Sequence, residues 1–140
     1  HTDTPLSEQD AHPVVDWQLS LKLAAGKEDL ARDLLRMLIE ALPNDRIELI
    51  ICWDHRSFEA LLAHAHRLHG GSRYTGTPTL RKTTGVMERA LTSAKKAGLF
   101  ETEESLEQIK IEQTVNFYAM IDAIDAVLAY PFEQIESKES

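Results

Sequence analysis

Residues 61–76 read LLAHAHRLHGGSRYTG, and this stretch carries the clearest structural signal in the chain. Successive helical residues are turned by about 100°, which places one set of mostly apolar residues on one side of a helix. The set consists of Phe58, Leu61, Leu62, Ala65, Leu68 and Ser72. His66 falls roughly 100° from the centre of that side. The stretch is therefore predicted to be an amphipathic helix with a histidine at the edge of its apolar face.

Small residues flank His66 on its own stripe of this helix. Ala63 precedes it by three positions and Gly70 follows it by four, and both spacings place residues on the same face. A glycine one turn away removes the side chain that would block a close approach. We interpret His66 as a histidine that exchanges a group with a docked protein. His69 lies one turn from His66, whereas His64 points away from both.

Helical signals continue on both sides of this stretch. Asp16 is predicted to cap a short helix over residues 17–25, which ends at Gly26. A 3.6-residue apolar stripe then begins, and Pro43 either kinks one long helix or splits it in two. The stripe consists of Leu30, Leu34, Leu35, Leu38, Ile39 and Leu42, and resumes at Ile47, Ile50 and Ile51.

Three further helices are predicted after residue 53. Asp54 is expected to cap the helix that runs to about Tyr74, with Gly76 as the residue that terminates it. Thr77 and Pro78 start the next helix, which stops at residues 95–98. The last helix is expected to run from Thr102 to about residue 130 without a break and to be the longest element.

The short connections between these helices imply antiparallel neighbours. The predicted fold is all-α, an up-down antiparallel four-helix bundle with a short extra N-terminal helix. We expect the bundle to span residues 14–131, with residues 1–13 a linker and residues 132–140 a C-terminal tail. The polar ends lead us to expect that the chain is part of a longer protein.

Composition narrows the possible functions. The chain has 140 residues, enough for one domain, and its net charge of −8 argues against a nucleic-acid surface. Cys52 is the single cysteine, so we expect a buried reduced thiol and a cytoplasmic setting. No signal peptide is visible, and the apolar stretches are too short to cross a bilayer.

The segment around His66 also resembles a known family. The string His66-Arg67-Leu68-His69-Gly70 is followed by Gly71 and Ser72, and Gly76 lies ten residues after His66. This pattern resembles the histidine-containing phosphotransfer (HPt) family, whose motif is His-x-Leu-Lys-Gly with small residues and a later glycine. The subgroup with His-x-Leu-His-Gly, a tyrosine and Gly-x-Pro is more similar still. It comprises the C-terminal HPt domains of BarA/GacS-type tripartite hybrid sensor kinases.

The resemblance implies a phosphorelay function. His66 would accept a phosphoryl group from a receiver-domain aspartate and pass it to the receiver of a response regulator. His69 stands where most of the family has lysine, and Arg73 and Arg67 are the alternative cations near the phosphoryl group. The expected docking residues are Leu62, Ala63 and Gly70.

The resemblance and the missing sequence motifs together indicate which cofactors and activities to expect of the domain. The partner receiver would supply Mg²⁺, so no cofactor or metal of its own is expected. The chain lacks a P-loop or other nucleotide motif, so we expect a phosphotransfer intermediate without kinase or ATPase activity of its own. It would form the cytoplasmic part of an inner-membrane sensor kinase, without direct membrane or nucleic-acid contact, and would be a monomer in isolation.

Other interpretations of these residues stay open. His55, His64, His66 and His69 could belong to a metal- or haem-binding bundle, although no Glu-x-x-His pair recurs on a second helix. A bundle that only binds other proteins is a third class. For single residues, His69 could be hydrogen-bonded within its own helix, and Arg67 and Arg73 could be ordinary solvated side chains. Ser72 is expected to be a small packing residue, and Tyr74 a core or capping aromatic.

Overall fold

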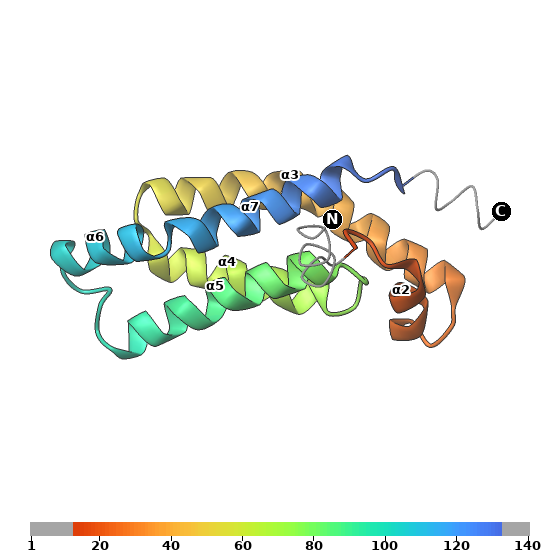
Figure 1. Ribbon diagram of the computed structural model, residues 1–140, viewed down its shortest axis with the longest axis horizontal. Helices are drawn as coiled ribbons and strands as arrows, with labels where there is room; N and C mark the ends of the chain where they lie inside the picture. The colour runs from red at the N-terminus through yellow and green to blue at the C-terminus, as the bar shows by residue number, and fades with distance from the viewer. Residues whose placement is uncertain (1–12, 133–140) are drawn as a thin grey trace, which may run out of the picture.

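The computed structural model describes residues 13–132, which form six α-helices and no strand (Figure 1). The helices are α2 (Trp17–Leu23), α3 (Glu28–Asp54), α4 (Phe58–Ser72), α5 (Pro78–Lys96), α6 (Glu103–Glu112) and α7 (Thr114–Ala129). The all-α prediction is confirmed. The predicted linker, residues 1–13, and the predicted tail, residues 132–140, lie almost entirely outside the described residues.

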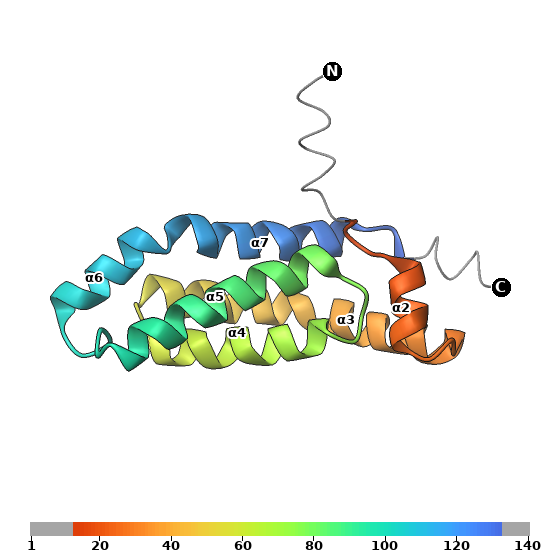
Figure 2. The same ribbon diagram turned by 60° about the horizontal axis from the view of Figure 1, so that its bottom comes forward.

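Four helices form the bundle. Each of α3, α4, α5 and α7 contacts two of the others, so that they close a ring in the order α3, α4, α5, α7. Consecutive members run in opposite directions, and α6 leads into α7 at one end (Figures 1 and 2). The short helix α2 lies across the other end of the bundle and packs on α3 (Figure 2). This is the predicted up-down bundle with an extra N-terminal helix.

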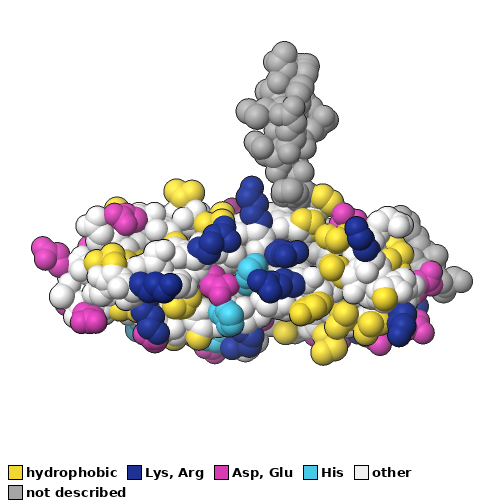
Figure 3. Space-filling model, turned by 90° about the horizontal axis from the view of Figure 1, so that it is seen from below, with side chains coloured by type: hydrophobic (Ala, Val, Ile, Leu, Met, Phe, Trp, Pro, Cys, Tyr) yellow, Lys and Arg dark blue, Asp and Glu magenta, His cyan; other side chains and the backbone are white. Residues whose placement is uncertain are grey.

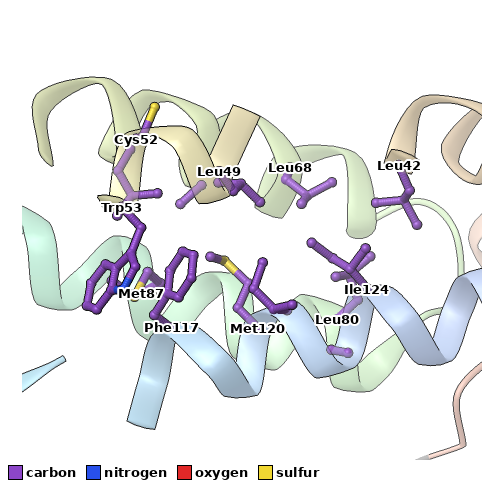
Figure 4. Close-up of a cluster of buried hydrophobic side chains, with 14 of the residues drawn as sticks. Leu42, Leu49, Cys52, Trp53, Leu68, Leu80, Met87, Phe117, Met120 and Ile124 are labelled. Carbon is purple, nitrogen blue, oxygen red and sulfur yellow. The ribbon is translucent and has the colours of Figure 1, made fainter. Parts of the chain in front are cut away.

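The core along the bundle axis is mainly aliphatic (Figure 4). Its aromatic centre is Trp53 stacked on Phe117, with ring centroids 4.4 Å apart. Burying a large apolar side chain stabilises a fold by about 1.5–3 kcal/mol. These buried core side chains therefore supply most of the driving force for folding. Cys52 is buried, as predicted, and burial raises the pKa of its thiol, with a smaller contribution from Glu48.

Helix α3 continues through Pro43 as a single helix. Proline removes one amide hydrogen bond, but Leu42 and Leu49 on either side are both fully buried and hold both halves on the core. The predicted stripe was wrong at Leu30, before the proline, and at Ile47 and Ile51, beyond it, because all three are exposed. The buried stripe instead passes through Leu49, Cys52 and Trp53.

Two predicted boundaries were wrong. Asp54 is the last residue of α3 rather than the cap of α4. Three more residues are needed for the chain to change direction between α3 and α4, and Arg56 among them has a φ of +53°. Ser57 is therefore the residue that precedes α4. The last helix is broken at Gln113, which separates α6 from α7, and beside the break the hydroxyl of Thr114 donates to the carbonyl of Lys110 at 2.6 Å. The longest element is therefore α3.

The loop between α4 and α5 is fastened to α2. Asp16 caps α2 as predicted, its side chain accepting from the amide of Leu19 at 3.0 Å. Ser20 donates to the carbonyl of Thr75 at 2.8 Å. A Cβ on Gly76 would lie 2.3 Å from Oγ of Ser20, and its φ is +59°, so only glycine fits. Gly76 thus serves this contact rather than ending α4, which is capped by Arg73.

Within residues 13–132, none of the helices has the length and apolar character needed to cross a membrane.

Candidate functional site

Three side chains meet where α4 packs on α5. His66 and His69 are one turn apart on α4 and present their rings to the same neighbour. Nδ1 of His66 is hydrogen-bonded to Oε2 of Glu88, and Nδ1 of His69 lies 3.0 Å from Oε1 of the same carboxylate. Glu88 lies on α5, the helix that contacts α4 most extensively. One carboxylate therefore bridges both histidines.

The protonation of this cluster follows from its geometry. Burial raises the pKa of Glu88, but the hydrogen bonds from His66 and His69 outweigh that effect and leave the pKa below its ordinary value. An ionised carboxylate only accepts hydrogen bonds, so both rings must carry their proton on Nδ1. The other ring nitrogen, Nε2, then has a free lone pair in each neutral ring.

The two histidines differ in exposure. The side chain of His66 is 75% exposed, whereas that of His69 is 16% exposed. A Cβ on Gly85 of α5 would lie 3.1 Å from Nε2 of His69, so the ring of His69 occupies the space that this glycine leaves. The ring of His66 is therefore mostly open to solvent, whereas Nε2 of His69 faces α5.

A shallow hollow of about 300 Å³ opens beside His66. It is lined by Glu59, Leu62, Ala63, His66, Glu88, Thr92 and Lys95. Lys95 and Glu59 form an ion pair across it. A Cβ on Gly70 would meet no atom within 4 Å, so a larger residue there would project into open space. The three predicted docking residues thus lie in or open onto the surface around His66.

The site therefore consists of an exposed imidazole whose Nδ1 is held by Glu88, beside a hollow lined partly by small side chains. The family model of the Hpt domain matches residues 28–130 of the chain.

The chain belongs to the Hpt domain family.

Curated relatives of this Hpt domain are sensor kinases. It is 41% identical over 96 residues to the sensor protein GacS of Pseudomonas syringae pv. syringae, covering 69% of this chain and 10% of that protein. It is 39% identical over 89 residues to the signal transduction histidine-protein kinase BarA of Escherichia coli K12, covering 64% and 10%. The chain thus spans about a tenth of these relatives.

A solved structure shares the fold. It is the crystal structure of the HPT domain from the Hpt sensor hybrid histidine kinase from Shewanella. The TM-score is 0.73 at 24% sequence identity, and the match covers 89% of this chain and 95% of that one.

The two candidate arginines of this Hpt domain lie in different surroundings. The guanidinium of Arg67 contacts Nδ1 of His64 at 2.8 Å and Asp45 at 3.6 Å, on the side away from Glu88. Arg73 is exposed and lines a second hollow together with His69. His69 itself is hydrogen-bonded across to α5 and not within its own helix. Arg73 is therefore better placed than Arg67 to act beside the two histidines.

The sequence predicts a packing role for Ser72 and a core or capping role for Tyr74. Ser72 is buried and donates to the carbonyl of His69 at 2.8 Å, which confirms the prediction. Tyr74 is 59% exposed, so the core alternative predicted for it was wrong. It lies two residues after the last residue of α4.

The histidines do not gather as ligands. No group of three or more His, Cys, Asp or Glu side chains within residues 13–132 is arranged to hold a metal ion. His64 contacts Arg67, and Nδ1 of His55 contacts the carbonyl of Ile51, so each has a partner other than His66.

Glu88 and Gly85 were missed from the sequence. Both lie on α5, about twenty residues after His66, and a glutamate on a polar helix face is usually a solvated residue. The only available signal is the spacing of three between Gly85 and Glu88, which puts them on one face of α5. Which face meets His66 depends on how α4 and α5 pack.

Proposed function

We propose that this Hpt domain carries a phosphoryl group on Nε2 of His66. The group comes from the phosphorylated aspartate of one receiver domain and goes to the aspartate of a second. In the first step the Nε2 lone pair attacks phosphorus, the new N–P bond forms, and the acyl P–O bond breaks to release the aspartate carboxylate. The second step is the reverse reaction with a different receiver.

The observation that carries this proposal is the bridge from His66 to Glu88. The Nδ1–H of His66 is held by a carboxylate, so Nε2 is unprotonated in the neutral ring, and the side chain as a whole is 75% exposed. No base is needed to free the nucleophile. The imidazole becomes positively charged as the N–P bond forms, and the anionic Glu88 stabilises that charge. Glu88 is thus a positioning residue that acts through His66.

His69 takes the place of the family's lysine in this proposal. It contacts the same carboxylate, and in its protonated form it adds a positive charge next to the phosphoryl group. Arg73, which lines the hollow on the far side of His69, adds a permanent one. The receiver supplies Mg²⁺ and the phosphorylated aspartate, because phosphoryl transfer depends mainly on positioning and charge neutralisation.

The names of the relatives support the wider setting. They are a sensor protein and a signal transduction histidine-protein kinase, and this chain matches about a tenth of each. We place the domain in the cytoplasmic part of a hybrid sensor kinase, where it links two receivers and has no ATP-dependent activity of its own.

Two histidine variants test the proposal. The wild-type domain, His66→Gln and His64→Gln are each mixed with a receiver phosphorylated with radiolabelled phosphate. Label should pass to the wild type and to His64→Gln, whose side chain lies away from Glu88, and not to His66→Gln. Transfer to His66→Gln at the wild-type rate would rule His66 out.

A further inference from the structure

A second hollow, of about 540 Å³, lies on the other side of His69 from His66. We name it the basic hollow. It is lined by Leu19, His69, Arg73, Pro78, Arg81, Lys82 and Arg89. Four of these seven residues carry a permanent positive charge, and no Asp or Glu is among them. The concentration of one charge sign is unusual for a chain whose net charge is −8.

The four cations of the basic hollow are not used by the fold. Elsewhere in the described chain, Arg46 pairs with Asp125, Arg56 with Glu107 and Lys95 with Glu59. By contrast, none of the four makes an ion pair or side-chain hydrogen bond to another residue within 13–132. They are Arg73, Arg81, Lys82 and Arg89, and all four are exposed. Three other exposed lysines, Lys22, Lys27 and Lys96, also make no ion pair within 13–132, so what distinguishes the four is that they line one hollow together with His69.

The basic hollow adjoins the phosphotransfer site. His69 lines it and also shares Glu88 with His66, so the two sites have a common wall. A Cβ on Gly85 would lie 3.1 Å from Nε2 of His69 and 3.4 Å from a guanidinium nitrogen of Arg89, so both heads lie over the same point of α5. Figure 3 shows Lys and Arg side chains gathered around the histidines on this face.

The receiver surface that approaches His66 is expected to be negatively charged. An aspartyl phosphate is anionic, and a protein that holds Mg²⁺ does so with carboxylate oxygens. A receiver that approaches His66 therefore presents an acidic surface. Opposite charges at the rim of an interface mainly accelerate association, and salt screens the effect.

We infer that Arg73, Arg81, Lys82 and Arg89 form a docking surface that attracts the acidic face of the receiver and speeds its encounter with His66. This inference rests on the proposed function. Arg81, Lys82 and Arg89 act only on association and orientation, whereas Arg73 also adds its charge beside the phosphoryl group in the transfer step carried by His66, Glu88 and His69. Three of the four residues lie on α5, outside the motif around His66.

Charge reversal tests the inference. The variant carries Arg81→Glu and Lys82→Glu, which keep Arg73 and the histidines intact. The matched control carries Lys27→Glu and Lys96→Glu, which change the net charge equally at sites outside both hollows. Circular dichroism verifies that each protein is folded. Transfer from a phosphorylated receiver and binding of the unphosphorylated receiver are both measured, at roughly 0.01 M and 1 M salt, where the Debye length is about 30 Å and 3 Å.

At low salt the second-order transfer rate constant and the receiver association rate of the variant should fall at least about tenfold, the lower range of electrostatic steering. The difference should nearly vanish at high salt. The rate at saturating receiver should be unchanged, and the control should match the wild type within about twofold at both salt concentrations.

Three results would overturn the inference. The first is a variant that behaves like the control. The second is a loss that persists at high salt or appears at saturating receiver, which would make the residues part of the contact or the chemistry. The third is binding of inorganic phosphate through these residues without any change in receiver association. A wild type that binds the receiver but takes no phosphate would refute the proposed function alone, because the binding data still test the surface.

Discussion

Replacing Glu88 with glutamine removes the charge of the bridge while keeping its shape. The carboxylate accepts from Nδ1 of His66 and from Nδ1 of His69, one on each oxygen. An amide has a single acceptor oxygen, and its NH₂ group can only donate. In Glu88→Gln at least one ring therefore loses its acceptor, and the charge that stabilises the phosphorylated ring is lost.

The expected loss of transition-state stabilisation in Glu88→Gln can be estimated from the solvent exposure of the two side chains. A hydrogen bond to a charged group contributes about 1.5–3 kcal/mol, whereas an exposed ion pair contributes about 0–1 kcal/mol. The side chain of His66 is 75% exposed and that of Glu88 is 22% exposed, so their contact lies between these cases. We expect a loss of about 1–2 kcal/mol in the transition state, which is roughly a 5- to 30-fold slower transfer.

Single-turnover transfer from a radiolabelled phosphorylated receiver measures this directly. The loss should appear in the rate at saturating receiver and not in the receiver affinity. Nitrogen-15 NMR should show that His66 spends less time as the Nδ1–H tautomer. Glu59→Gln is the matched control, because Glu59 lines the same hollow but pairs with Lys95. Wild-type transfer by Glu88→Gln, or an equal loss in Glu59→Gln, would refute the role of the bridge.

Four further outcomes are expected. Gly70→Gln should slow transfer sharply with unchanged helix content, since its side chain projects from the docking surface into open space; normal transfer would place Gly70 outside the contact. His69→Lys should retain transfer and make it less dependent on pH between about 6 and 8, because lysine stays charged; a pH profile identical to that of the wild type would leave His69 with a packing role. Because the pKa of Glu88 is lowered by folding, its contribution to stability is present above about pH 4.5 and lost as the pH falls through the lowered value. Glu88→Gln should therefore flatten the acid side of the unfolding curve, and an unchanged curve would contradict the assigned ionisation. Light scattering at micromolar concentration should find a monomer, since the bundle buries its long apolar stripes internally; a stable dimer would contradict this.

Local rules predicted most of the fold. Asp16, Thr77 with Pro78, and Thr102 begin helices where the capping rules place them, and Leu35, Leu38 and Leu42 are buried at the predicted spacing. The errors occur where a turn interrupts the helical periodicity. The last helix is interrupted at Gln113, and the reversal at Arg56 shifts the start of α4 by three residues.

Only part of the site could be predicted from the sequence. His66, His69 and the small residues around them lie on one helix, so their relation follows from a 3.6-residue period. Glu88 lies on a different helix, and its place opposite both rings is set by the packing of α4 on α5. The four cations of the basic hollow become a group for the same reason. Periodicity within one helix carries no information about that register.

Tandem mass spectrometry of the domain after incubation with a phosphorylated receiver shows whether His66 alone receives the phosphoryl group. We expect one phosphoryl group per domain, labile in acid and stable in alkali, located on His66 and absent from His64 and His69. A phosphate on any other residue, an acid-stable phosphate, or no transfer from any receiver would contradict this expectation.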